Sequence, residues 1–188
     1  MHNTGVCGEK SLSDWGGVSL RLATGDFPSG GVFAFAYSEG VRVVMNTLIG
    51  PSCFIEDLQI GMSANTTRSV TEDDIVKFAE VSGDHNPLHF DEAFAAGTKF
   101  GGRVAHGMLT ASFISALFGN QFPGPGCIYI SQTLKFKAPV RIGDTVKVEV
   151  TLTDLRATRN RATFRTIASV DEKVVIEGEA VAHVPSRP

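Results

Sequence analysis

The chain has 188 residues, a formal net charge of −3, and a composition of 43% hydrophobic and 20% charged residues. This length allows one domain with a substantial core, and the composition excludes a disordered or fibrous chain. No basic excess is present to attract nucleic acid or an anionic membrane surface, so an anionic ligand would need a local site.

The first 50 residues differ from the rest of the sequence. They contain 9 of the 20 glycines and show no sustained apolar period of a strand or a helix. Two short apolar segments, residues 32–37 and 41–44, are compatible with a hairpin or an added strand. We interpret residues 1–50 as an extension of unknown role, poorly ordered by composition, and residues 51–188 as the folded domain.

Helical signals follow. Thr71, with Asp74 three residues later, forms a capping pattern with an acidic first turn, and Gly83 can end the helix. Residues 91–96 predict a short second helix. Residues 106–118 predict an uncharged helix roughly 20 Å long at 1.5 Å per residue. This helix is apolar nearly all round, so other elements must surround it.

The C-terminal half alternates apolar and polar residues with the period of a strand. The alternation predicts four consecutive strands joined by short turns, and a fifth, entry strand precedes the helices. The five segments are residues 54–70, 134–138, 145–155, 162–170 and 173–184. Helices followed by a run of strands indicate an α+β class with an antiparallel sheet, one face of which is polar. A long apolar helix beside such a curved sheet is the hot-dog fold.

Several features favour a cytoplasmic protein. Residues 104–134 carry no charge, but the apolar part spans only residues 108–118, and a membrane helix needs roughly 20 apolar residues. The N-terminus shows no secretory pattern of basic residues followed by an apolar stretch. Cys7, Cys53 and Cys127 are far apart and odd in number, which predicts no disulfide framework and no thiolate metal site.

The densest polar cluster is residues 82–89, directly after the first predicted helix. One interpretation is turn chemistry, because Asp84 and its neighbours can bond nearby amides. A second is a catalytic pair of Asp84 with a histidine, and a third is a metal site. Pro87 breaks the helix between His85 and His89, which weakens the metal interpretation, since ligation of the HExxH type needs an unbroken helix.

A second candidate group is His106 and Gly107, at the start of the long apolar helix. The first N–H groups of a helix lack partners and carry a positive dipole, so they suit an anion or a developing oxyanion. Gly107 presents an amide with no Cβ in the way, although the glycine could instead serve close packing. We interpret His106 as a structural residue or cap rather than a base.

These motifs, in this order and spacing, resemble the MaoC-like (R)-specific enoyl-CoA hydratases, also called hydratase 2. The resemblance covers residues 52–185 and leaves out the N-terminal extension. It rests on Asp84-x-Asn86-Pro87-Leu88-His89, Phe94-Ala95-Ala96, His106-Gly107-Met108-Leu109 and Gly178-Glu179-Ala180-Val181.

The resemblance implies a hot-dog homodimer that reversibly hydrates trans-2-enoyl thioesters to (3R)-hydroxyacyl products without a cofactor or metal. Asp84 and His89 would hold and activate the water, and either could be the base. Gly107 would bind the thioester oxygen, and Asn86 would orient Asp84 or the thioester. Ser115 would support the aspartate, although a helix serine can equally bond its own backbone.

The resemblance leaves the substrate open. Phe118 lies where the acyl tail could end, which predicts a short-chain preference, or it is simply a core residue. The thioester could be carried by coenzyme A or by acyl carrier protein, and Lys135, Lys137 and Arg141 are candidates to bind phosphates.

Two other functions are alternatives to a hydratase. A hot-dog thioesterase would need a carboxylate on the central helix, and residues 108–118 contain none. A non-catalytic module that binds acyl thioesters would not need both Asp84 and His89, and both are present.

Overall fold

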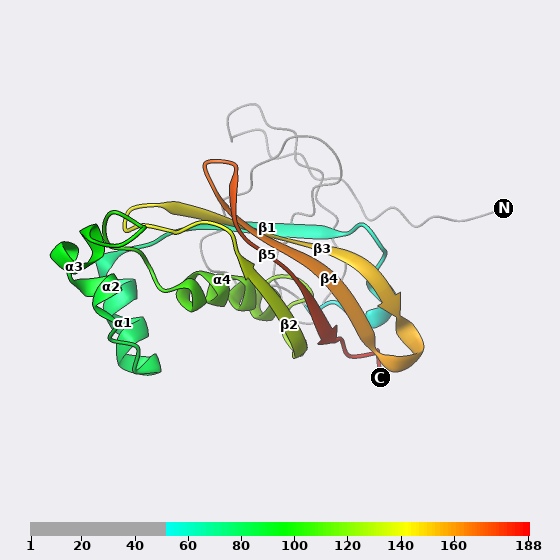
Figure 1. Ribbon diagram of the computed structural model, residues 1–188. Helices are drawn as coiled ribbons and strands as arrows, with labels where there is room; N and C mark the ends of the chain where they lie inside the picture. Colours follow the sequence, from blue (N-terminus) through cyan, green and yellow to red (C-terminus); the bar gives the residue numbers. More distant parts are fainter. Residues whose placement is uncertain (1–51) are drawn as a thin grey trace, which may run out of the picture. The chain divides into compact units, whose positions relative to one another are not determined.

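The computed structural model describes residues 52–188 (Figure 1). The predicted extension of residues 1–50, and Cys7 within it, lie outside the described residues. The elements in chain order are η1 (Ile55–Asp57), β1 (Ser63–Ser69), α1 (Glu72–Ser82), α2 (Pro87–Phe90), α3 (Glu92–Ala96), α4 (Gly107–Asn120), β2 (Ile128–Phe136), β3 (Thr145–Arg156), η2 (Ala157–Arg159), β4 (Arg161–Val170) and β5 (Lys173–His183).

The five strands form one antiparallel sheet in the order β1-β3-β4-β5-β2, which confirms the predicted α+β class. The order differs from a simple succession of neighbouring strands. The predicted turn after β2 does not make a hairpin with β3; β2 crosses to the far edge and pairs with β5. The β2 strand also begins at Ile128, earlier than predicted, with an irregular register between Tyr129 and Ser131.

The long helix α4 packs across one face of this sheet (Figure 1). Its buried residues include Leu109, Phe113, Ile114, Leu117 and Phe118. They meet the inward-facing side chains of the strands, such as Val146, Val148, Val150, Leu152 and Phe164, and together form one core. Among the described helices, none has the length and apolarity needed to cross a membrane.

The short helices α1, α2 and α3 gather at one end of the sheet, beside the start of α4 (Figure 1). Helix α1 begins as predicted: the Thr71 side chain accepts a hydrogen bond from the Asp74 N–H, and Gly83 ends the helix with a φ of 76°. That positive φ is a conformation glycine adopts without strain. The chain therefore turns sharply at Gly83 and enters the polar cluster.

The prediction that Pro87 only interrupts helical structure was incomplete. Pro87 is the first residue of α2, which the Asn86 side chain caps by accepting a hydrogen bond from the Leu88 N–H. Proline suits this position because it has no N–H to leave unpaired and its φ is already helical. His89 therefore lies on α2, whereas His85 lies in the preceding loop.

Candidate active site

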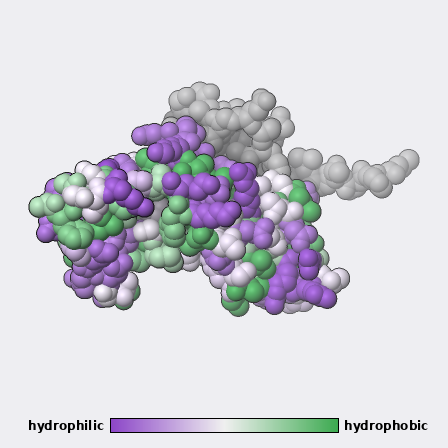
Figure 2. All heavy atoms as spheres, in the orientation of Figure 1, coloured by the Kyte–Doolittle hydropathy of each residue, from purple (hydrophilic) through white to green (hydrophobic). Residues whose placement is uncertain are grey.

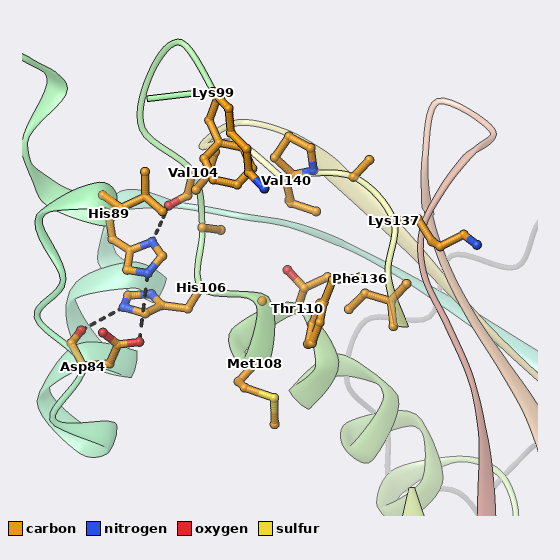
Figure 3. A pocket seen from close by; sticks show the side chains of 17 residues that line it. Asp84, His89, Lys99, Val104, His106, Met108, Thr110, Phe136, Lys137 and Val140 are labelled. Carbon is orange, nitrogen blue, oxygen red and sulfur yellow. Dashed lines mark hydrogen bonds and ion pairs between the residues drawn. The ribbon is translucent and has the colours of Figure 1, made fainter. Parts of the chain in front are cut away.

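Asp84 lies in the loop between α1 and α2, and local hydrogen bonds set its orientation. Its N–H donates to Ser82 Oγ at 3.2 Å, and its Oδ1 accepts the Asn86 N–H at 3.2 Å. The turn interpretation is therefore correct for the backbone of this loop. It does not use the second carboxylate oxygen, Oδ2, which faces His89 (Figure 3).

His89 is 7% exposed, and its ring is held in one tautomer. Nδ1 lies 2.7 Å from the Val104 carbonyl oxygen, which can only accept, so Nδ1 carries the proton. The lone pair is then on Nε2, which lies 4.0 Å from Asp84 Oδ2 (Figure 3). This separation is too long for a direct hydrogen bond, but one water could bond to both atoms at about 2.8 Å.

His106 contacts both Asp84 and His89. Its Nε2–H donates to the Asp84 carbonyl oxygen at 2.9 Å, and its ring stacks on His89 with centroids 3.7 Å apart. The residue is 2% exposed, and burial lowers the pKa of its imidazole below the ordinary value, so the ring is neutral at pH 7. His106 occupies the N-cap position of α4 without a side-chain capping bond, so it is a structural residue rather than a cap.

Asp84, His89 and His106 lie close enough together to be considered as ligands of a metal ion, since one ligand atom from each lies within 4.8 Å of the others. The two imidazoles, however, stack with only 31° between their planes. Their lone pairs lie in these planes, so one ring would have to turn before both could bind one ion. The geometry as it stands suits a bound water better.

Arg103 fixes the position of α2, and nothing in the sequence pattern indicated this. Its Nε–H donates to the His89 carbonyl oxygen at 2.7 Å, and its guanidinium pairs with Glu72 at the start of α1 at 2.6 Å. Arg103 thus holds the backbone carbonyl of His89, and the Val104 carbonyl holds its ring.

Gly107 is the first residue of α4, so its N–H has no acceptor within the helix. The ring of Phe136 packs directly over it: a Cβ at this position would lie 2.7 Å from Phe136 Cε1. The glycine therefore serves close packing as well as leaving an amide accessible at the positive end of the helix. Both alternatives weighed for this residue are compatible with the structure.

These groups line a cleft of about 490 Å³, in the size range of small-molecule sites. One end is polar, with Asp84, His89, His106 and Gly107, and Lys99 and Lys137 also border it (Figure 3). The remaining wall is mostly apolar and consists of Leu88, Phe100, Val104, Ala105, Met108, Thr110, Phe136, Ala138, Pro139, Val140 and Ile176.

Other predicted residues lie apart from this cleft. Ser115 is exposed on α4, and His85 is exposed in its loop. Phe118 is buried against Tyr129 and Phe164 and does not line the cleft, so its part in limiting acyl length stays a prediction.

The predicted phosphate-binding residues are partly engaged in the structure. Lys137 pairs with Glu177, and the Arg141 guanidinium donates to the Phe100 and Arg103 carbonyl oxygens. Lys99, which no sequence motif indicated, lines the cleft with its ammonium over the Phe100 ring.

Comparison with known proteins places these features in a family context. Residues 57–174 match the model of the MaoC like domain. The chain is 48% identical over 134 residues to a 3-hydroxybutyryl-CoA dehydratase of Methylorubrum extorquens, covering 71% of this chain and 85% of that protein. It is 53% identical over 134 residues to an (R)-specific enoyl-CoA hydratase of Rhodospirillum rubrum, covering 71% and 93%. The solved (R)-hydratase from A. caviae superposes with a TM-score of 0.67 at 42% identity, over 69% of this chain and 99% of that one.

Proposed function

This chain belongs to the MaoC-like domain family, and from that premise we propose that it is an (R)-specific enoyl-CoA hydratase. It reversibly adds water to a trans-2-enoyl-CoA and forms the (3R)-3-hydroxyacyl-CoA. The observation that carries this proposal is the gap of 4.0 Å between His89 Nε2 and Asp84 Oδ2, at the polar end of a cleft of substrate size.

The catalytic water binds in that gap. It donates one O–H to His89 Nε2 and the other to Asp84 Oδ2, so one oxygen lone pair faces C3 of the enoyl group. His89 is the base, because its Nδ1–H is committed to the Val104 carbonyl and its Nε2 lone pair is unshared. The imidazolium that forms is stabilised by the Asp84 carboxylate and by the neutral ring of His106 stacked on it.

The electrons displaced from the C2–C3 double bond move to the thioester oxygen. The Gly107 N–H, at the positive end of α4, donates to that oxygen. His89 then returns the proton to C2, the carbonyl re-forms, and both His89 and Asp84 recover their starting charge. The net change is the addition of one water, with a new C3–O bond and a new C2–H bond.

We propose further that the protein acts as a homodimer through the edge of β2 and the adjoining face of α4. The edge strand exposes Ile128, Ile130 and Phe136, and α4 exposes Met108. Hydrophobic side chains are interspersed with hydrophilic ones over the face in view (Figure 2). Open strand edges and exposed apolar patches are typical of protein interfaces.

Coenzyme A is the proposed carrier of the acyl group, with Lys99 at the cleft as the candidate to bind its phosphates. Lys137 also borders the cleft and would have to leave Glu177 to do so. An acyl-carrier-protein substrate is the second candidate, because the chain is also 41% identical to a 3-hydroxyacyl-[acyl-carrier-protein] dehydratase of Arabidopsis thaliana. A short acyl chain and a cytoplasmic location remain predictions.

The function is tested with crotonyl-CoA and crotonyl-acyl carrier protein as substrates. We expect the enoyl absorbance of crotonyl-CoA to fall without release of free thiol, and chiral analysis to give the (3R) product. Release of thiol would indicate a thioesterase, and binding without either change would indicate a non-catalytic module. Turnover of the carrier-protein substrate alone would establish the second candidate.

Replacing Gly107 by alanine is expected to lower kcat/KM by about 10²-fold, as much as losing one oxyanion donor, because alanine keeps the N–H but blocks access to it. The added methyl group would meet Phe136 Cε1, so either it or the displaced ring takes up space beside the N–H. Combining Gly107→Ala with Phe136→Ala should recover part of the activity. Steady-state kinetics on the three variants measures this, and unchanged rates in Gly107→Ala would contradict it.

A further inference from the structure

Thr110 carries a buried hydroxyl that the described residues leave unsatisfied. The residue is 1% exposed, and its Oγ1 has no hydrogen-bond partner within residues 52–188. Threonine in a helix can bond its hydroxyl back to the carbonyl four residues earlier. Here the Thr110 N–H donates to the His106 carbonyl oxygen at 3.3 Å, but the hydroxyl makes no such bond.

Thr166 is the other buried threonine among the described residues, and its hydroxyl has a partner. Thr166 is 0% exposed, and its Oγ1 lies 3.1 Å from Gln132 Nε2, which donates to it. Leaving a buried hydroxyl unpaired destabilises a folded protein, whereas an apolar side chain of the same shape does not. An unpaired hydroxyl that lines a cleft is therefore expected to bond to a ligand.

The position of Thr110 indicates which ligand atom it would meet. It lies three residues after Gly107, hence on the same side of α4 one turn further on. Helix side chains lean back towards the N-terminus, so the Thr110 hydroxyl leans towards the turn that carries the Gly107 N–H. Both residues line the cleft, and Figure 3 shows the Thr110 side chain on the cleft side of α4, next to Phe136.

We propose that Thr110 is a second donor to the thioester oxygen, acting together with the Gly107 N–H. This inference rests on the proposed hydratase function. When water attacks C3, the electron pair of the double bond moves through C2 to the thioester oxygen, and the Thr110 O–H donates to the negative charge that collects there. The hydroxyl keeps its proton throughout, and its hydrogen bond weakens again when C2 is protonated.

The surroundings of Thr110 strengthen such a bond. The cleft that Thr110 lines has a mostly apolar wall, which includes Val140, Ile176 and Ala138, so little water competes for the hydroxyl. A hydrogen bond to a charged oxygen in such surroundings is stronger than one to a neutral carbonyl. The donor therefore favours the enolate over the bound substrate, which is the condition for a donor to accelerate the reaction.

The test compares Thr110→Val, which has nearly the same shape without the hydroxyl, with Thr110→Ser, which keeps the hydroxyl. We expect Thr110→Val to lower kcat for crotonyl-CoA by about 10- to 100-fold, with a Tm equal to or above that of the wild type. Thr110→Ser should retain most of the activity. Thr166→Val is the matched control: it should lower the Tm, since it breaks a buried hydrogen bond, and leave kcat close to the wild-type value.

A spectroscopic measurement separates donation to the thioester from a change in shape. An α,β-unsaturated thioester absorbs at longer wavelength when its carbonyl oxygen accepts hydrogen bonds. Hexadienoyl-CoA bound to an Asp84→Asn background should show a red shift that is smaller when Thr110→Val is added. If the valine variant does not fold, Thr110→Ala provides the same deletion.

The outcomes are distinguishable. If the wild-type protein hydrates no enoyl thioester, the proposed function itself is wrong. An active wild type with Thr110→Val at full kcat and an unchanged red shift would overturn the role of Thr110 alone. If Thr110→Val lowers the Tm as much as Thr166→Val does, the Thr110 hydroxyl stabilises the fold and is not a donor to the substrate.

Discussion

Replacing His89 by asparagine, or Asp84 by asparagine, is expected to lower kcat for crotonyl-CoA hydration by about 10³-fold. Asparagine at 89 can still donate from its δ position to the Val104 carbonyl, but it has no atom at the place of Nε2. Asparagine at 84 keeps an oxygen to accept the Asn86 N–H, but it removes the negative charge opposite the imidazolium. Each variant thus deletes one function of the pair and keeps one of its local hydrogen bonds.

The matched control for these variants is His85→Gln, which changes an exposed histidine one residue from Asp84. We expect it to retain wild-type kcat, since its side chain is not among the groups that line the cleft. Thermal unfolding of all three variants checks that the fold is intact. Wild-type turnover in a folded His89→Asn or Asp84→Asn variant would refute the assignment of the pair.

Replacing Gly178 by alanine is expected to lower the free energy of unfolding by about 3 kcal/mol. Gly178 lies in β5 opposite Leu134 of the edge strand β2. A Cβ there would lie 1.8 Å from the Thr133 carbonyl oxygen, a backbone atom that can move only if the two strands separate. The variant should therefore weaken the pairing of β2 with β5, and with it the edge that we propose to form the dimer.

Urea denaturation at a fixed protein concentration measures this effect, because an oligomer's stability depends on concentration. Gly119→Ala on α4 is the control: a Cβ at Gly119 meets no atom within 4 Å, and alanine is the better helix former. We expect that variant to be as stable as the wild type or more so. A Gly178→Ala protein of unchanged stability would mean that the strands accommodate the methyl group.

The elements that depend on neighbours in sequence were predictable. The cap at Thr71 and Asp74, the end at Gly83 and the apolar helix α4 all follow from contacts within a few residues, and the structure confirms them. Alternation with a period of two identified the strands β3, β4 and β5. This pattern is also local, because it depends only on which face of each strand is buried. The motif from Asp84 to His89 is equally local.

Helix α2 shows where local signals become ambiguous. Proline ends one helix and begins another, and nothing in the sequence alone distinguishes the two uses at Pro87. One interpretation of residues 82–89 was turn chemistry with a helix broken at Pro87, whereas the structure places His89 on a capped turn of helix. The role of His89 stays a prediction, and the element that orients it became visible only in the structure.

The sequence by itself determined the class of fold, the buried helix and the residues of the candidate pair, because these depend on short-range caps, periodicity and motif spacing. Only the tertiary structure decided the strand order, since β2 pairs with a strand that comes last in the chain. It also decided the tautomer of His89, the stacking of His106 and the unpaired hydroxyl of Thr110. Each of these depends on atoms that packing brings together from distant parts of the chain. No local pattern in the sequence predicts such contacts.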